Sequence, residues 1–119
     1  IRDAVENAAR NGLADRVRFV EGRAELELEA LLEESGAEAA HISVVLDPPR
    51  RGCDPLLLDT LVRLQPERIV YVSCEPSTLA RDLRRLTEAG YRVERVQPVD
   101  MFPWTEHVEC VVLMSRVKD

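Results

Sequence analysis

The stretch Ile42-Ser-Val-Val-Leu-Asp-Pro-Pro-Arg50 carries the strongest structural signal in this sequence. Its first five residues are mostly β-branched and apolar, which is typical of a strand buried in a parallel sheet. Two prolines end this strand, because each of them restricts φ and lacks an N–H donor. A second strand at Ile69-Val-Tyr-Val72 runs into a helix that begins at Pro76. This order of elements favours an α/β fold.

On both sides of this stretch, the predicted helices and strands alternate along most of the chain. Helical spacing of apolar residues is found in the segments 1–11, 24–34, 55–64 and 76–89. In the third of these we expect an inner face formed by Leu56, Leu57, Leu61 and Leu64. Residues 17–20 alternate as a short strand, and so do the final segments 91–99 and 108–117. We therefore expect one domain with a mostly parallel sheet, closed by a C-terminal antiparallel hairpin.

Composition excludes several classes of protein. The 119 residues contain 22 acidic and 16 basic side chains, for a net charge of −6, which disfavours non-specific nucleic-acid binding through long-range charge. No apolar run approaches the roughly 18 residues of a membrane span, and no leader opens the chain, so we expect a cytoplasmic protein. Three cysteines without C-x-x-C spacing and two histidines disfavour a disulfide framework and a metal site.

The chemistry-bearing residues follow the predicted strands, where parallel sheets bind ligands. Cys74 lies between a strand and a helix N-terminus, a place that stabilises a thiolate nucleophile, although a small apolar filler explains a lone cysteine as well. Asp47 begins a loop made rigid by two prolines, which suits the binding of a planar base. Five arginines would form a local basic rim, and a solvated helix face is the simpler interpretation of them: Arg50, Arg51, Arg81, Arg84 and Arg85.

A third segment joins the two strands of the predicted hairpin. In it Phe102 and Trp104 are candidates for stacking on a base, and Glu106 and Glu109 are candidate general bases. A hairpin turn with an aromatic plug is the structural alternative.

Together the motifs resemble the RNA uracil-5-methyltransferase family, the S-adenosylmethionine-dependent enzymes that make 5-methyluridine in ribosomal and transfer RNA. The resemblance covers nearly the whole chain. It rests on three segments in the family's order: Leu46-Asp-Pro-Pro-Arg-Arg-Gly52, Val72-Ser-Cys-Glu-Pro-Ser-Thr-Leu-Ala-Arg-Asp82 and Met101-Phe-Pro-Trp-Thr-Glu-His-Val-Glu109.

The resemblance implies a Rossmann-like class I methyltransferase fold and a covalent mechanism. Cys74 would be the nucleophile that adds to C6 of the uracil, and Glu109 the general base that removes the C5 proton. Asp47 would contact S-adenosylmethionine and the flipped base, and Arg50 would hold the uracil. The chain departs from the family's pattern in having Glu75 where Asn is usual and Trp104 where His is frequent.

The family's Gly-rich cofactor loop has no counterpart here, so we interpret residues 1–119 as the C-terminal portion of a catalytic domain that lacks strands 1 and 2. Three expectations follow. The isolated segment should be inactive, strands 4, 5, 7 and 6 should keep the family's order, and the edge at Ile42–Leu46 should be covered, either by residues 17–20 or by a second copy in a homodimer. The alternative from another functional class is a catalytically silent interaction module, and a thiol-redox domain is a weaker third.

Overall fold

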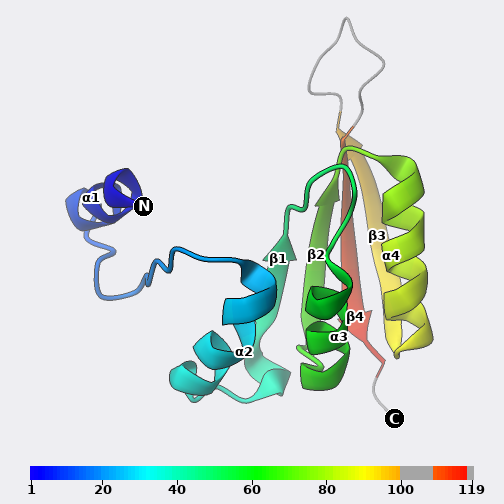
Figure 1. Ribbon diagram of the computed structural model, residues 1–119, viewed down its shortest axis with the longest axis horizontal. Coiled ribbons are helices and arrows are strands. Elements are labelled where there is room, and N and C mark those ends of the chain that lie inside the picture. The colour runs from blue at the N-terminus through cyan, green and yellow to red at the C-terminus, as the bar shows by residue number, and fades with distance from the viewer. Residues whose placement is uncertain (100–108, 118–119) are drawn as a thin grey trace, which may run out of the picture.

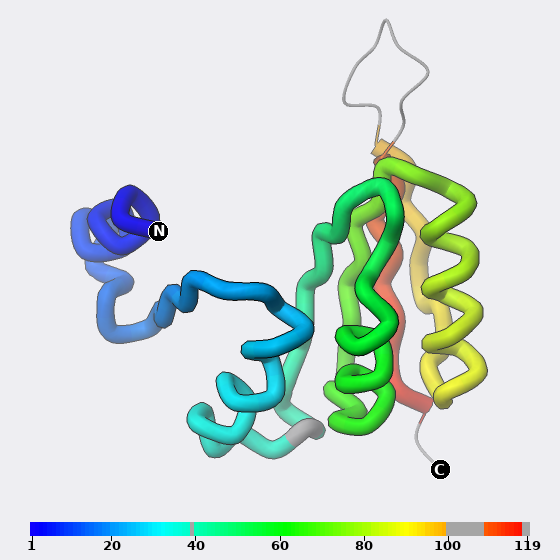
Figure 2. Tube along the Cα trace, viewed as in Figure 1, coloured from blue at the N-terminus to red at the C-terminus, as the bar shows by residue number. Residues whose placement is uncertain are grey.

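The computed structural model describes residues 1–99 and 109–117 (Figures 1 and 2). Along the chain it contains α1 (Arg2–Arg10), α2 (Ala24–Ser35), a short 3₁₀ helix (Ala39–His41), β1 (Ser43–Leu46), α3 (Pro55–Leu64), β2 (Arg68–Ser73), α4 (Pro76–Glu88), β3 (Tyr91–Val99) and β4 (Glu109–Arg116). The four predicted helices are therefore confirmed, with ends within two residues of those expected.

The strands form one mixed sheet in the order β1-β2-β4-β3. β1 and β2 pair in parallel, whereas β4 runs antiparallel to both β2 and β3. β1, β2 and β3 consequently share one direction, and the predicted C-terminal hairpin is confirmed. The order also confirms the expected arrangement of strands 4, 5, 7 and 6.

Helices α3 and α4 lie on the same face of the sheet (Figure 1). α3 begins where the Asp54 carboxylate accepts the Leu56 N–H at 2.9 Å, and Pro55 provides its first turn. Between the helices and the sheet lies a core whose most completely buried apolar side chains are Leu61, Ile69, Tyr71, Leu86, Val112 and Met114. The prediction that Leu56 faces this core is wrong, since its side chain is 48% exposed and Leu58 is buried instead.

The strand predicted at residues 17–20 is not formed. This segment runs from α1 to α2 outside the sheet, and its side chains are exposed (Figure 2). Arg18 pairs there with Glu34 of α2. Alternation makes a segment suitable for a strand, but a strand also needs a hydrogen-bonding neighbour, and β1 is not that neighbour here. The prediction that residues 17–20 cover β1 is therefore wrong as well.

Strand β1 forms an edge of the described sheet. It pairs with β2 on one side, and its Val45 side chain is 70% exposed. An apolar edge strand is a template for pairing with another chain. Coverage by a second copy stays a prediction, which light scattering at several concentrations tests: a mass that rises toward that of a dimer supports it, and a constant monomer mass contradicts it.

Among the residues that the structure describes, no helix has the length and apolar character needed to cross a membrane.

Candidate active site

Two of the predicted site residues lie at the carboxyl ends of neighbouring parallel strands. Asp47 directly follows β1, and Cys74 directly follows β2. Leu46 pairs with Tyr71, so Cys74 lies two residues further along the sheet than Asp47. From strand spacing and rise, their Cα atoms are roughly 8 Å apart. The structure thus brings the two residues to one edge of the sheet, as predicted.

Glu109 comes to the same edge from the far end of the sequence. It is the first residue of β4, and the β2–β4 register pairs Ser73 with Cys110. Cys74 directly follows Ser73 at the end of β2, and Glu109 directly precedes Cys110 at the start of β4. The candidate nucleophile and the candidate base are therefore neighbours.

The other candidates for base stacking and for the general base belong to the segment between β3 and β4. Phe102, Trp104 and Glu106 lie outside the described residues.

The surroundings of Cys74 explain how the chain accommodates an acidic residue next to it. The Glu75 carboxylate accepts a hydrogen bond from the Ser77 hydroxyl at 3.0 Å. The Ser73 hydroxyl accepts the Glu75 N–H and donates to the Glu75 carbonyl, both at 3.0 Å. These bonds hold the connection between β2 and α4, while Cys74 itself is half-buried.

The loop after β1, residues 47–53, borders a cavity of about 270 Å³. Asp47 lines it together with the end of β1 and the beginning of α2, at Ala24 and Glu25. The volume is at the low end of ligand pockets, so it suits one part of a larger ligand. Cys74 is not among the residues that line this cavity.

Three side chains of α4 bind the second half of this loop, and sequence analysis assigned no role of this kind to them. The Thr78 hydroxyl donates to the Arg50 carbonyl at 2.7 Å, and Arg81 Nη2 donates to the Arg51 carbonyl at 2.8 Å. The Asp82 carboxylate accepts the Cys53 N–H at 2.8 Å. Their spacing of three and four residues, which places them on one helix face, was the available signal.

Burial changes the acidity of the groups around Asp82. Desolvation, together with the Asp82 charge, raises the pKa of the Cys53 thiol to about 11. Desolvation and the hydrogen bond to Asp82 also raise the pKa of Tyr71. Cys53 is therefore a protonated, buried thiol at neutral pH, unlike a reactive nucleophile.

This shift predicts a loss of stability at high pH. The folded state holds the Cys53 proton more tightly than the unfolded chain, so the stabilisation is complete below pH 9 and is lost as pH rises toward about 11. We expect the free energy of unfolding to fall by about 2 kcal/mol over that interval through this group. Urea unfolding at a series of pH values measures it. A Cys53→Ala variant should show a shallower fall, and identical slopes would contradict the assignment.

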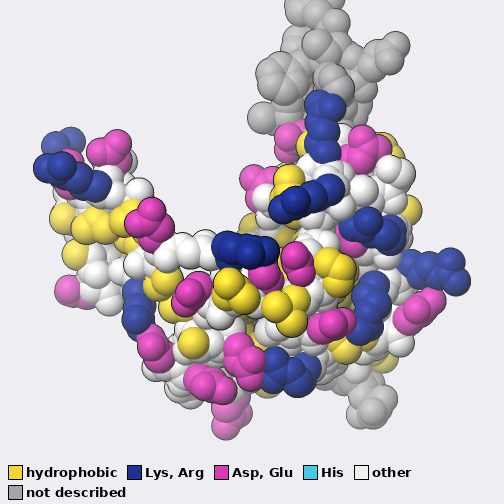
Figure 3. Space-filling view, viewed as in Figure 1, with side chains coloured by type: hydrophobic (Ala, Val, Ile, Leu, Met, Phe, Trp, Pro, Cys, Tyr) yellow, Lys and Arg dark blue, Asp and Glu magenta, His cyan; other side chains and the backbone are white. Residues whose placement is uncertain are grey.

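The predicted basic rim exists as a surface feature. Arginine side chains lie over the loop after β1 and over α4 (Figure 3). The five arginines predicted for it are all exposed, and three of them pair with acidic side chains: Arg81 with Asp82, Arg84 with Glu88 and Arg85 with Asp59. Charge on this face is thus partly compensated, in keeping with a solvated helix face.

Within residues 1–99 and 109–117, no cluster of three or more His, Cys, Asp or Glu side chains has the arrangement of a metal site.

Comparison with known proteins gives a consistent picture. A family model described as tRNA (uracil-5-)-methyltransferase matches residues 28–117. A Bacillus cereus protein named as an uncharacterized RNA methyltransferase is 53% identical over 118 residues, which are 99% of this chain and 25% of that protein. The chain therefore spans about a quarter of the length of such relatives.

Solved structures agree with the sequence comparison. The Pyrococcus abyssi tRNA (uracil-54, C5)-methyltransferase, solved in complex with S-adenosyl-L-homocysteine, is 35% identical with a TM-score of 0.67. That similarity covers 96% of this chain and 26% of the other. A Streptococcus agalactiae protein of the NADB-Rossmann superfamily is 17% identical with a TM-score of 0.61. The match covers 99% of this chain and 47% of that protein, and it shows a similar fold alone.

Proposed function

Since the chain belongs to the tRNA (uracil-5-)-methyltransferase family, we propose that it carries the uracil chemistry of an S-adenosylmethionine-dependent RNA uracil-5-methyltransferase. The observation that carries this proposal is the strand register, which pairs Ser73 with Cys110 and so brings Cys74 and Glu109 to the edge where Asp47 also lies. A candidate nucleophile, a candidate base and a polar side chain therefore lie at one edge of the sheet, as covalent catalysis at a pyrimidine ring requires.

In the proposed reaction, the Cys74 sulfur forms a bond to C6 of a flipped uridine, and the C5–C6 double bond shifts its electrons into an enolate. Carbon 5 thereby becomes nucleophilic enough to accept a methyl group. S-adenosylmethionine supplies that methyl group as an electrophile when it is bound. The Glu109 carboxylate then removes the C5 proton, the double bond re-forms, and the Cys74 sulfur leaves C6.

The described residues fit one part of the cofactor. Asp47 offers a carboxylate at the mouth of a cavity whose other walls include Val45, Pro48 and Ala24. Glu25, Arg51 and Asp54 also line it, and apolar walls with a few polar groups are typical of small-molecule sites. Asp47 is thus the residue that we assign to cofactor binding, and Arg50 is assigned to the uracil.

The test is to trap the covalent adduct. In the full-length protein, Glu109→Gln should form the Cys74–C6 bond and transfer the methyl group, and then stall because the C5 proton is not removed. A denaturing gel with substrate RNA and methyl-labelled cofactor should show a slower, labelled protein band. The double variant Cys74→Ala/Glu109→Gln is the control and should show no such band.

Clean turnover by the Glu109→Gln protein would remove this residue from the role of base. Absence of both adduct and turnover in the wild-type protein would favour the silent interaction module. The RNA class follows from nucleoside analysis of ribosomal and transfer RNA in cells that lack the gene, because the substrate pool alone should lose 5-methyluridine.

A further inference from the structure

The loop that carries Asp47 and Arg50 is held along its second half by one face of α4. Successive backbone groups are bound in order: the Arg50 carbonyl by Thr78 and the Arg51 carbonyl by Arg81. The Cys53 N–H is bound by Asp82. Three attachments within four residues leave this half of the loop little freedom to move independently of the helix.

Asp82 is the centre of this arrangement. Its side chain is completely buried, and its Oδ2 accepts both the Cys53 N–H at 2.8 Å and the Tyr71 hydroxyl at 2.6 Å. Its Oδ1 accepts Arg81 Nε at 3.2 Å. A buried carboxylate is costly unless its oxygens are satisfied, so these donors explain how Asp82 is tolerated in the interior. One side chain thereby joins β2, α4 and the loop.

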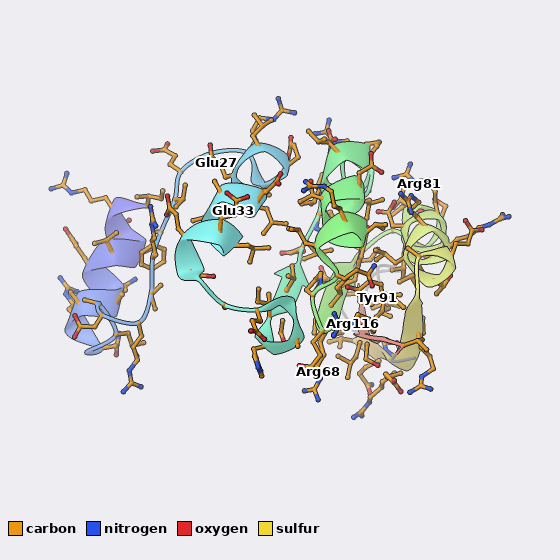
Figure 4. The ribbon with its side chains drawn as sticks, turned by 90° about the horizontal axis from the view of Figure 1, so that it is seen from below. Glu27, Glu33, Arg68, Arg81, Tyr91 and Arg116 are labelled. Atoms are coloured by element: carbon orange, nitrogen blue, oxygen red, sulfur yellow. The ribbon has the colours of Figure 1, made fainter. Side chains whose placement is uncertain are left out.

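The position of α4 connects this joint with the thiol. The helix begins at Pro76, two residues after Cys74, and Tyr71 precedes Cys74 by three residues on β2. The helix that holds the loop therefore follows directly from the segment that presents the sulfur. Arg81, which binds the loop, lies on this helix (Figure 4). Any movement of the loop relative to α4 therefore also moves Arg50 relative to Cys74.

Gly52 shows how closely the loop approaches the helix. Its φ is +85°, and an added Cβ would lie 2.7 Å from Asp82 Oδ2 and 2.5 Å from Arg81 Nη2. Side-chain atoms of α4 thus occupy the space beside the loop backbone. The two segments are packed against each other as well as hydrogen-bonded.

On the basis of the proposed function, we propose that Thr78, Arg81 and Asp82 are positioning residues that set the uracil-binding loop relative to the catalytic thiol. They do not touch the substrate. They act through the backbone of residues 50–53, and their loss leaves every catalytic side chain present but misplaced. Misplacement by about 1 Å can cost two orders of magnitude in rate.

The experiment uses four variants of the full-length protein. Asp82→Ala should lower kcat at least about tenfold, measured per folded molecule at saturating cofactor and RNA. Thr78→Val, which keeps the side-chain shape but loses the hydroxyl, should lower kcat about threefold or more, with a fall in Tm no larger than that of the control variant described next. Thr78→Ser should restore kcat. The KM for RNA should stay within about threefold throughout, since every side chain that the proposal assigns to the uracil is retained.

Tyr91→Phe is the matched control. Tyr91 is labelled in Figure 4. Its hydroxyl donates to the Pro66 carbonyl, near the opposite end of the sheet, and the residue is 3% exposed. Loss of this bond should lower the Tm with kcat unchanged. If Asp82→Ala does not fold, the Thr78→Val and Thr78→Ser pair decides the question. Wild-type kcat in Thr78→Val, or an equal loss of kcat in Tyr91→Phe, would overturn the proposal.

Hydrogen exchange separates this proposal from the proposed function. The Cys53 amide should exchange faster in Thr78→Val than in wild type, and at the wild-type rate in Thr78→Ser. Unchanged exchange in Thr78→Val would refute the attachment itself. A wild-type protein that methylates no uridine but shows the expected exchange pattern would refute the proposed function and the catalytic purpose of the attachment, while leaving the attachment in place.

Discussion

Cys74→Ala should abolish methylation in the full-length protein, by roughly a thousandfold or more in kcat. Without the sulfur no bond to C6 forms, and carbon 5 of the uracil stays too poor a nucleophile for methyl transfer. Cys74 is only half-buried at the end of β2, so a uracil ring can reach its sulfur. Incorporation of labelled methyl groups into RNA measures the loss.

The matched control for this substitution is Cys110→Ala. Cys110 pairs with Ser73 in the strand register and packs against the core. Its loss should lower stability slightly and leave most of the activity. If Cys74→Ala keeps substantial turnover, or if both variants lose activity equally, the covalent mechanism at Cys74 is contradicted.

Gly52→Ala should destabilise the protein by roughly 2–4 kcal/mol and disturb the loop after β1. A left-handed backbone at φ +85° costs a non-glycine residue about 1–2 kcal/mol. The added methyl would also lie 2.7 Å from Asp82 Oδ2, so the buried carboxylate must move and weaken its bonds to Cys53 and Tyr71. Thermal and denaturant unfolding measure the change.

Gly36→Ala separates the two causes. Gly36 also has a positive φ, +66° after α2, but an added Cβ there has nothing within 4 Å. It should therefore cost only the conformational part, about 1 kcal/mol. Equal losses in the two variants would mean that the contact between Gly52 and Asp82 contributes nothing. A larger loss at Gly52, accompanied by lower kcat, is the expected result.

The helices and the main strands were predictable because their signals are local. Pro55 and Pro76 begin helices at the positions where a missing N–H costs nothing, and Asp54 caps the first of them. The β-branched runs at β1 and β2 mark strands without help from the rest of the chain. The grouping of Asp47 and Cys74 also followed, because the ends of parallel strands share one edge.

Other features depend on partners far away in the sequence. Residues 17–20 alternate like a strand, but no neighbouring strand pairs with them, so the pattern has no structural outcome. Leu56 has the same side chain as Leu57 and Leu58. Packing of α3 against the rest of the fold decides that Leu57 and Leu58 are buried and Leu56 is exposed.

The sequence by itself therefore determined the helices, most of the strands and the α/β class, since turn residues and strand runs act over a few neighbouring positions. The candidate nucleophile and base came from the resemblance of its motifs to a known family. Only the tertiary structure decided that the start of β4 at Glu109 comes beside the end of β2 next to Cys74, and that Asp82 is buried. In a helix that reads Arg-Asp-Leu-Arg-Arg, an aspartate would be expected in solvent. Its donors, Tyr71 and Cys53, lie 11 and 29 residues away, and only packing of the helix on the sheet brings them within hydrogen-bond distance.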